Sequence, residues 1–149
     1  MNKFLLIIFV FLSFSGYGQT QIKAPENAMT ELEEFKKKEK FAKDSTSFYT
    51  GVADPKMRTV LTDKINKAAD DFKAVAEGES PTAKKYQDMI KIGLSRFSDV
   101  KMDLDTEDRE RLCGYFEELM DIVGLESSGG HLMMFMYGFS LPESPKSGE

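Results

Sequence analysis

The segment from Asp54 to Gly78 constrains the fold of this chain more than any other part of the sequence. Its apolar residues recur at three- and four-residue spacing, which is the period of an amphipathic helix, whereas a strand would alternate. Asp54 suits an N-cap, Pro55 suits the first helical position, and Gly78 suits a left-handed C-cap. The apolar positions are Met57, Val60, Leu61, Ile65, Ala68, Ala69, Phe72, Val75 and Ala76. The segment therefore predicts a long helix with one buried face.

Three further segments carry helix-capping signals beside similar apolar stripes. The expected caps are Thr30 with Glu33, Ser80 before Pro81, and either Asp105 or Thr106, with Gly124 closing the last of these helices. Four amphipathic helices joined by short links are typical of a bundle. The sequence thus predicts an all-α fold, a small four-helix bundle-like domain.

A short apolar stretch, His131–Tyr137, follows the pair Gly129-Gly130. It is too short and too uniformly apolar for periodicity to distinguish a helix from a strand. Gly138 directly after it can cap a final helical turn. We therefore expect a short C-terminal helix here.

The N-terminus has the features of a secretion signal. Lys3 precedes an apolar run over residues 4–12, and small residues follow as far as Gly18. A membrane-spanning helix needs about 20 apolar residues, so residues 1–18 are interpreted as a cleaved signal peptide. We expect a loose arm over 19–27, a single helical domain over 28–140 and a disordered tail over 141–149. The mature protein is then periplasmic or secreted, with no membrane span after signal cleavage.

Charge and cysteine content narrow the possible partners. The chain has 25 acidic and 20 basic residues and a net charge of −5. Such a balance argues against nucleic-acid binding, which depends on basic patches. Cys113 is the only cysteine, so no disulfide can form within the chain. Its place beside the apolar stripe of its helix predicts a buried, inert thiol.

His131 is the only histidine, so any histidine-based hydrolase must use it. A nucleophile such as Ser127, Ser128 or Cys113 would have to lie within hydrogen-bond reach, with a carboxylate such as Glu126 orienting the ring. No G-x-S-x-G motif surrounds either serine. A small hydrolase-like enzyme using His131 therefore stays an alternative hypothesis, and no catalytic residue is assigned.

Two segments of the sequence contain possible metal ligands. Read as a calcium-binding loop starting at Asp103, the sequence has Asp108 where glycine is needed and Gly114 where the bidentate glutamate is needed, so helix capping explains these acids better. The alternative is Cu(I) handling, because histidine and methionine are soft ligands. The residues concerned are His131, Met133, Met134 and Met136. Methionine more often fills irregular core space, so no metal ligand and no cofactor are assigned.

The stretch YFEELMDIVGLESS, residues 115–128, followed by Tyr137-Gly138-Phe139, resembles a family of small bacterial exported helical domains of unknown function. The resemblance is strongest over Tyr115–Phe139. It implies a helical domain ending near Ser140, and it implies no ligand, cofactor or catalytic residue.

These observations favour an exported, non-enzymatic binding or interaction module. Its partner, a protein or a small molecule, is not specified by the sequence. The apolar segment Leu132–Phe139 after the glycine pair is the place where we expect either core packing or an exposed binding patch.

Overall fold

A computed structural model describes residues 19–138 of the chain. The expected signal peptide, residues 1–18, and the expected C-terminal tail, residues 141–149, lie outside this range. The described part contains five α-helices and one short 3₁₀ helix, and no strand is present in it. In chain order the elements are α1 (Ala28–Lys37), α2 (Pro55–Glu77), α3 (Ala83–Ser95), η1 (Lys101–Asp103), α4 (Thr106–Val123) and α5 (His131–Tyr137). The predicted all-α class is confirmed.

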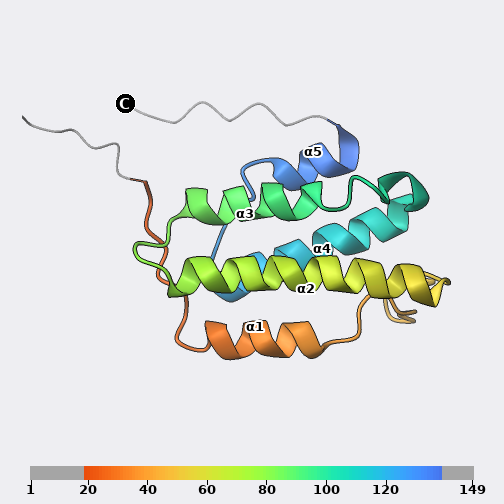
Figure 1. Ribbon diagram of the computed structural model, residues 1–149, viewed down its shortest axis with the longest axis horizontal. Coiled ribbons are helices and arrows are strands. Elements are labelled where there is room, and N and C mark those ends of the chain that lie inside the picture. The colour runs from red at the N-terminus through yellow and green to blue at the C-terminus, as the bar shows by residue number, and fades with distance from the viewer. Residues whose placement is uncertain (1–18, 139–149) are drawn as a thin grey trace, which may run out of the picture.

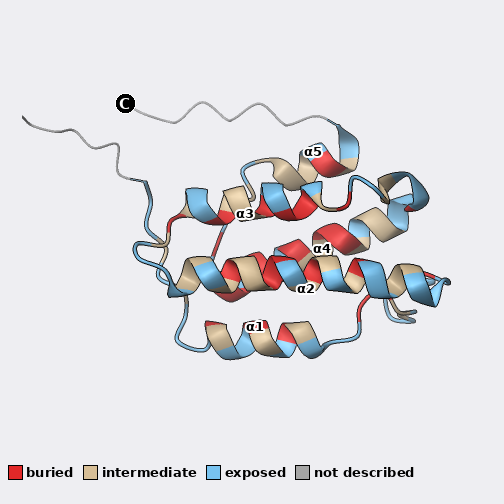
Figure 2. Ribbon diagram, viewed as in Figure 1, coloured by how far each residue is buried: buried red, intermediate tan, exposed pale blue. Residues whose placement is uncertain are grey.

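Helix α2 is the centre of the bundle and contacts α1, α3 and α4 (Figure 1). Helix α1 lies in the groove between α2 and α4, whereas α5 lies between α3 and α4 on the other side. The buried faces of the four longer helices point at one another, as Figure 2 shows. In the described part of the chain, no helix is both long and apolar enough to cross a bilayer.

The caps of α2 and α4 largely agree with the sequence. Asp54 accepts a hydrogen bond from the backbone N–H of Lys56 at 2.9 Å, and Asp105 accepts one from that of Asp108 at 2.8 Å. Gly124 ends α4 in the left-handed conformation with φ 73°. Gly78 ends α2 as expected, but its φ is −77°, so the predicted left-handed cap is wrong at that position.

Helix α1 begins and ends elsewhere than its capping signals suggest. Asn27 is its N-cap residue, so Thr30 lies inside the helix and the predicted capping box is wrong. Asn27 Nδ2 instead donates to Glu31 Oε1 at 2.7 Å. The helix stops at Lys37 because the following chain turns back, with Phe41 buried at a φ of 57°.

Helix α3 starts two residues later than predicted, because its entry is shaped by the N-terminal arm. Thr82 is the N-cap and accepts from the Lys85 backbone N–H, so the expectation of a Ser80 cap is wrong. The Pro81 carbonyl accepts from the Ile22 N–H at 2.9 Å, and the Thr20 carbonyl accepts from the Ala83 N–H at 3.1 Å. The arm over 19–27, expected to be loose, is thus held by backbone hydrogen bonds at this point.

A continuous apolar core joins all five α-helices. Gly93 permits the close approach of α3 and α4: a Cβ there would lie 2.8 Å from two ring carbons of Phe116. Fully buried large side chains include Phe35, Phe41, Phe72, Tyr86, Phe97 and Phe116. The predicted apolar stripes of α2 and α4 supply much of this core.

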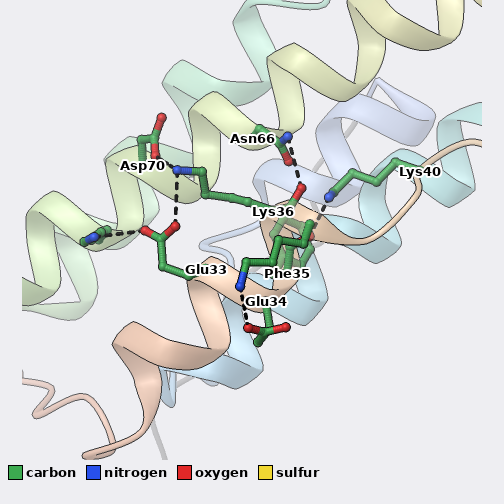
Figure 3. Close-up of polar contacts among 9 residues, drawn as sticks. Glu33, Glu34, Phe35, Lys36, Lys40, Asn66 and Asp70 are labelled. Carbon is green, nitrogen blue, oxygen red and sulfur yellow. Dashed lines mark hydrogen bonds and ion pairs between the residues drawn. The ribbon is translucent and has the colours of Figure 1, made fainter.

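One charged residue lies inside the core (Figure 3). Lys40 is 1% exposed, and its Nζ donates to the carbonyl oxygens of Phe35 at 2.6 Å and Lys38 at 3.2 Å. The ammonium also lies 4.4 Å from the centroid of the Phe35 ring. Burial lowers the pKa of Lys40 to about 8. The side chain therefore satisfies carbonyl groups that the end of α1 leaves without helical partners.

Candidate functional site

Helix α5 is held between two glycines in the left-handed conformation, Gly130 with φ 80° and Gly138 with φ 76°. The predicted short C-terminal helix is confirmed. Phe135 is buried in the core, whereas Met134 is 47% exposed. A hollow lies on each flank of α5, so the segment both completes the core and borders two candidate binding sites.

The first hollow, which we call the basic-rimmed groove, lies between α3 and α5 and has a volume of about 320 Å³. Its floor is apolar. Its lining residues are Lys91, Leu94, Ser95, Ser98, Lys101, His131, Met134 and Phe135. Lys101 Nζ lies 4.7 Å from the centroid of the Phe135 ring, which places a positive charge directly over the floor. None of the described lining residues is acidic.

His131 lies at the edge of this groove, and its imidazole has no hydrogen-bond partner within the described chain. Partial burial lowers the pKa of His131, the positive charge of Lys91 lowers it further, and Asp88 opposes them. The ring is therefore mainly neutral at pH 7. Glu126, the expected orienting carboxylate, is exposed and does not line the groove.

The second hollow, which we call the sulfur-lined cavity, lies between α4 and α5 and has a volume of about 380 Å³. It is lined by Glu110, Cys113, Glu117, Leu132, Met133, Met136 and Tyr137. Cys113 is 6% exposed, and burial, with smaller contributions from Glu117 and Glu110, raises the pKa of its thiol to about 12. The thiol is thus protonated at neutral pH, as expected for a buried cysteine.

The candidate nucleophiles of the hydrolase hypothesis do not meet the imidazole of His131 in the structure. Cys113 and His131 line different hollows on different flanks of α5. Ser127 Oγ accepts a hydrogen bond from the Gly129 N–H at 3.2 Å, and the Ser128 carbonyl accepts from the His131 N–H at 3.4 Å. Both serines therefore brace the turn into α5, and neither is joined to the imidazole.

The four residues of the predicted Cu(I) site are divided in the same way. Met134 and His131 line the basic-rimmed groove, whereas Met133 and Met136 line the sulfur-lined cavity. A single ion cannot take all four as ligands, so the ligand set suggested by the sequence is wrong. Among the described residues, no group of three or more histidine, cysteine, aspartate or glutamate side chains is arranged to hold a metal.

The acidic residues of α4 have separate roles. Asp105 caps the helix, in agreement with the interpretation of the Asp103–Glu107 stretch as capping. Glu118 forms an ion pair with Lys38 and so ties α4 to the end of α1. Glu117 lines the sulfur-lined cavity. Glu117 and Glu118 therefore have different surroundings, although they are adjacent in the sequence.

Sequence reasoning missed the part of the groove that α3 and η1 contribute. Lys91, Leu94 and Ser95 follow helical spacing on α3 and therefore share one face, and Ser98 follows in the turn after the helix. Their spacing was available in the sequence, but nothing in it indicated that α5 would lie beside that face. Lys101 comes from the short η1 segment, which the sequence suggested only as a link.

Comparison with known proteins identifies the family. The model of the DUF4844 family, a domain of unknown function, matches residues 23–140. The chain belongs to the DUF4844 family. The matched range includes both hollows beside α5.

A solved structure supports the fold of this DUF4844 domain. A DUF3571 family protein from Acinetobacter baumannii has 37% sequence identity and a TM-score of 0.68, with 74% of this chain and 89% of that chain covered. No functionally curated protein matches the sequence significantly. The resemblance to a helical family of unknown function is thus confirmed, and neither description names a ligand or a reaction.

Proposed function

We propose that this DUF4844 protein is an exported, non-enzymatic binding module, and that its basic-rimmed groove holds an apolar ligand with a negatively charged group. Support for export is the N-terminal pattern of Lys3, the apolar run over 4–12 and the small residues up to Gly18. Support for binding is the combination of an apolar floor and a positive rim in one hollow.

The floor of the groove favours a hydrocarbon or aromatic group. Leu94, Met134 and Phe135 line it, and a side chain such as Met134 adapts easily to different shapes. Its volume of about 320 Å³ lies at the lower end of the usual range for small-molecule sites, about 300–1,000 Å³. The ligand is therefore expected to be small.

The charge of the rim is the observation that carries the proposal. The whole chain has a net charge of −5, yet the ionisable residues that line this hollow are two lysines and one histidine, with no acid among the described lining residues. Lys91 makes no ion pair or hydrogen bond within the described part of the protein, so its charge is available to a ligand. An anion at the groove would be attracted by Lys91 and Lys101 while its apolar part leaves water.

Calorimetric titration with dodecanoate tests this proposal, with dodecylamine as a ligand of the same chain length and opposite charge. We expect saturable binding of dodecanoate and weaker binding of the amine. Exposed charge pairs each contribute about 0.2–1 kcal/mol, so Lys91→Met combined with Lys101→Met should weaken dodecanoate binding about two- to thirtyfold.

Lys67→Met is the matched control, because Lys67 is an exposed lysine of α2 outside the groove. It should leave the affinity unchanged. Equal binding of the two ligands, or equal effects of the control and the groove variants, would contradict the proposal. Secretion is tested separately: the N-terminal residue of protein recovered from the native envelope or medium should be Gln19, and an intact N-terminus there would contradict cleavage after Gly18.

A further inference from the structure

We propose that the sulfur-lined cavity is a Cu(I) site, with the thiolate of Cys113 and the thioethers of Met133 and Met136 as its ligands. This site goes beyond the ligand-binding groove and does not depend on it, because the two hollows lie on different flanks of α5. Sulfur ligands of this kind select Cu(I) over the harder divalent ions.

Cys113, Met133 and Met136 line the same hollow. Met133 and Met136 are three residues apart on α5 and so share a helix face. Cys113 comes from the middle of α4, on the opposite wall of the cavity. The thiol is 6% exposed and makes no hydrogen bond within the described chain, so no protein group competes with a metal ion for it. Three-coordinate sulfur ligation needs no further residue.

The surrounding charge favours a cation at the thiolate. Glu110 and Glu117 also line the cavity, so their negative charges attract a cation to it. A bound Cu(I) ion compensates that charge. In the binding step the S–H bond of Cys113 breaks, its proton passes to solvent, and a Cu–S bond forms without any change in oxidation state.

Helix α5 also provides a matched control for the assignment. Met134 and His131 are soft ligands in the same short helix, but they line the basic-rimmed groove. Substitution of either residue should leave the affinity of the sulfur-lined cavity for Cu(I) unchanged. This division separates the structural proposal from a general affinity of methionine-rich segments for copper.

The test is competition for Cu(I) with a chromophoric chelator under ascorbate, using the intact mature protein. We expect one equivalent per chain to be withheld from the chelator by the wild type. Loss of an outer-shell partner alone typically costs a metal site about 10- to 100-fold in affinity, so Met133→Leu with Met136→Leu should weaken binding by at least about 100-fold. Leucine preserves the side-chain volume, and the fold is checked by circular dichroism.

The control pair Met134→Leu with His131→Ala should bind Cu(I) as tightly as the wild type. The Met133/Met136 variant keeps Cys113, so undiminished affinity in it would show that the metal is held by the thiol alone and would overturn the proposal. Equal weakening in both double variants would overturn it as well.

Discussion

Helices α1 and α5 occupy corresponding positions on the two sides of the bundle, each in a groove between α4 and one other helix. Polar links cross from α1 and its C-cap to neighbouring helices. Lys36 pairs with Asp70 at 2.7 Å (Figure 3), and Lys73 pairs with Glu33 at 2.9 Å. The C-cap residue Lys38 pairs with Glu118. In contrast, residues 131–136 of α5 make no ion pair or side-chain hydrogen bond within the described chain.

The attachment of α5 is chiefly apolar and comes from few residues. Phe135 is its one buried side chain, while Leu132 and Met136 pack against the core as partly buried residues. Left-handed glycines flank the helix. Segments with few buried contacts open locally at low cost in free energy. Helix α1 is thus attached to the bundle by polar links as well as by packing. Helix α5 is held mainly by a few apolar contacts, and it borders both candidate sites.

Truncating the aromatic anchor of each helix should give the largest difference between α1 and α5. Phe35→Ala in α1 should lower the free energy of unfolding by about 3–5 kcal/mol, because it empties a fully buried site. Phe135→Ala in α5 should lower it by less than about 3 kcal/mol, since local opening of α5 absorbs part of the loss. Urea denaturation measures both.

Amide hydrogen exchange then distinguishes local from global effects. In Phe135→Ala the amides of α5 should lose protection while those of α2 keep theirs; in Phe35→Ala all helices should lose protection together. Uniform loss in both variants would show that α5 is as firmly integrated as α1, and the comparison would fail.

Lys40 offers the next largest effect. Its pKa is about 8 in the folded chain and near its ordinary 10.5 in the unfolded chain. Between these pH values the unfolded chain retains a proton that the folded chain has released, so stability rises with pH in this window. From pH 8 to 10.5 the wild type should gain about 1–3 kcal/mol relative to Lys40→Met. A constant difference between the two proteins over that range would contradict a lowered pKa.

The smallest effect belongs to the ion pairs on the surface of the α1–α2 interface. The hydrogen bond from Lys73, and then the charge of Lys36, hold the pKa of Glu33 below its ordinary value of 4.5. The stabilisation is present above pH 4.5 and is lost as the pH falls further through the lowered pKa. Glu33→Gln should therefore destabilise the protein slightly at pH 7, and it should have no such effect at a pH below the lowered pKa of Glu33.

Salt provides a check on the same pair. At about 1 M salt the Debye length is about 3 Å, so the effect of Glu33→Gln at pH 7 should shrink. If it persists unchanged, the glutamate contributes through packing and not through charge. Thermal unfolding at low salt and at about 1 M salt measures this difference.

Much of the fold could be predicted because its signals are local. Asp54 with Pro55, and Asp105 before α4, cap their helices as expected, since capping depends on neighbouring backbone groups. The starts of α1 and α3 were predicted wrongly because more than one residue near each start can act as the N-cap: Asn27 caps α1 and Thr82 caps α3. At α3 the competition was decided by backbone hydrogen bonds from residues 20–22, which are distant in sequence.

The candidate sites could be predicted only in part. The sequence indicated α5 as the segment of interest and His131, Cys113 and the methionines as its reactive groups. It could not indicate which of them meet, because the direction of a side chain in a short apolar helix depends on which face docks. Burial of Phe135 fixed that direction. Met134 therefore lines the basic-rimmed groove, whereas Met133 and Met136 line the sulfur-lined cavity.

The amino-acid sequence by itself determined the all-α class, the apolar stripes of α2 and α4 and most of their caps, because helix period and capping act over a few residues. The tertiary structure alone decided that Lys40 is buried at the end of α1, that α3 and α5 enclose a groove with a basic rim, and that Cys113, Met133 and Met136 line one cavity. These features join residues far apart in the chain, and only the packing of one helix on another brings such residues together.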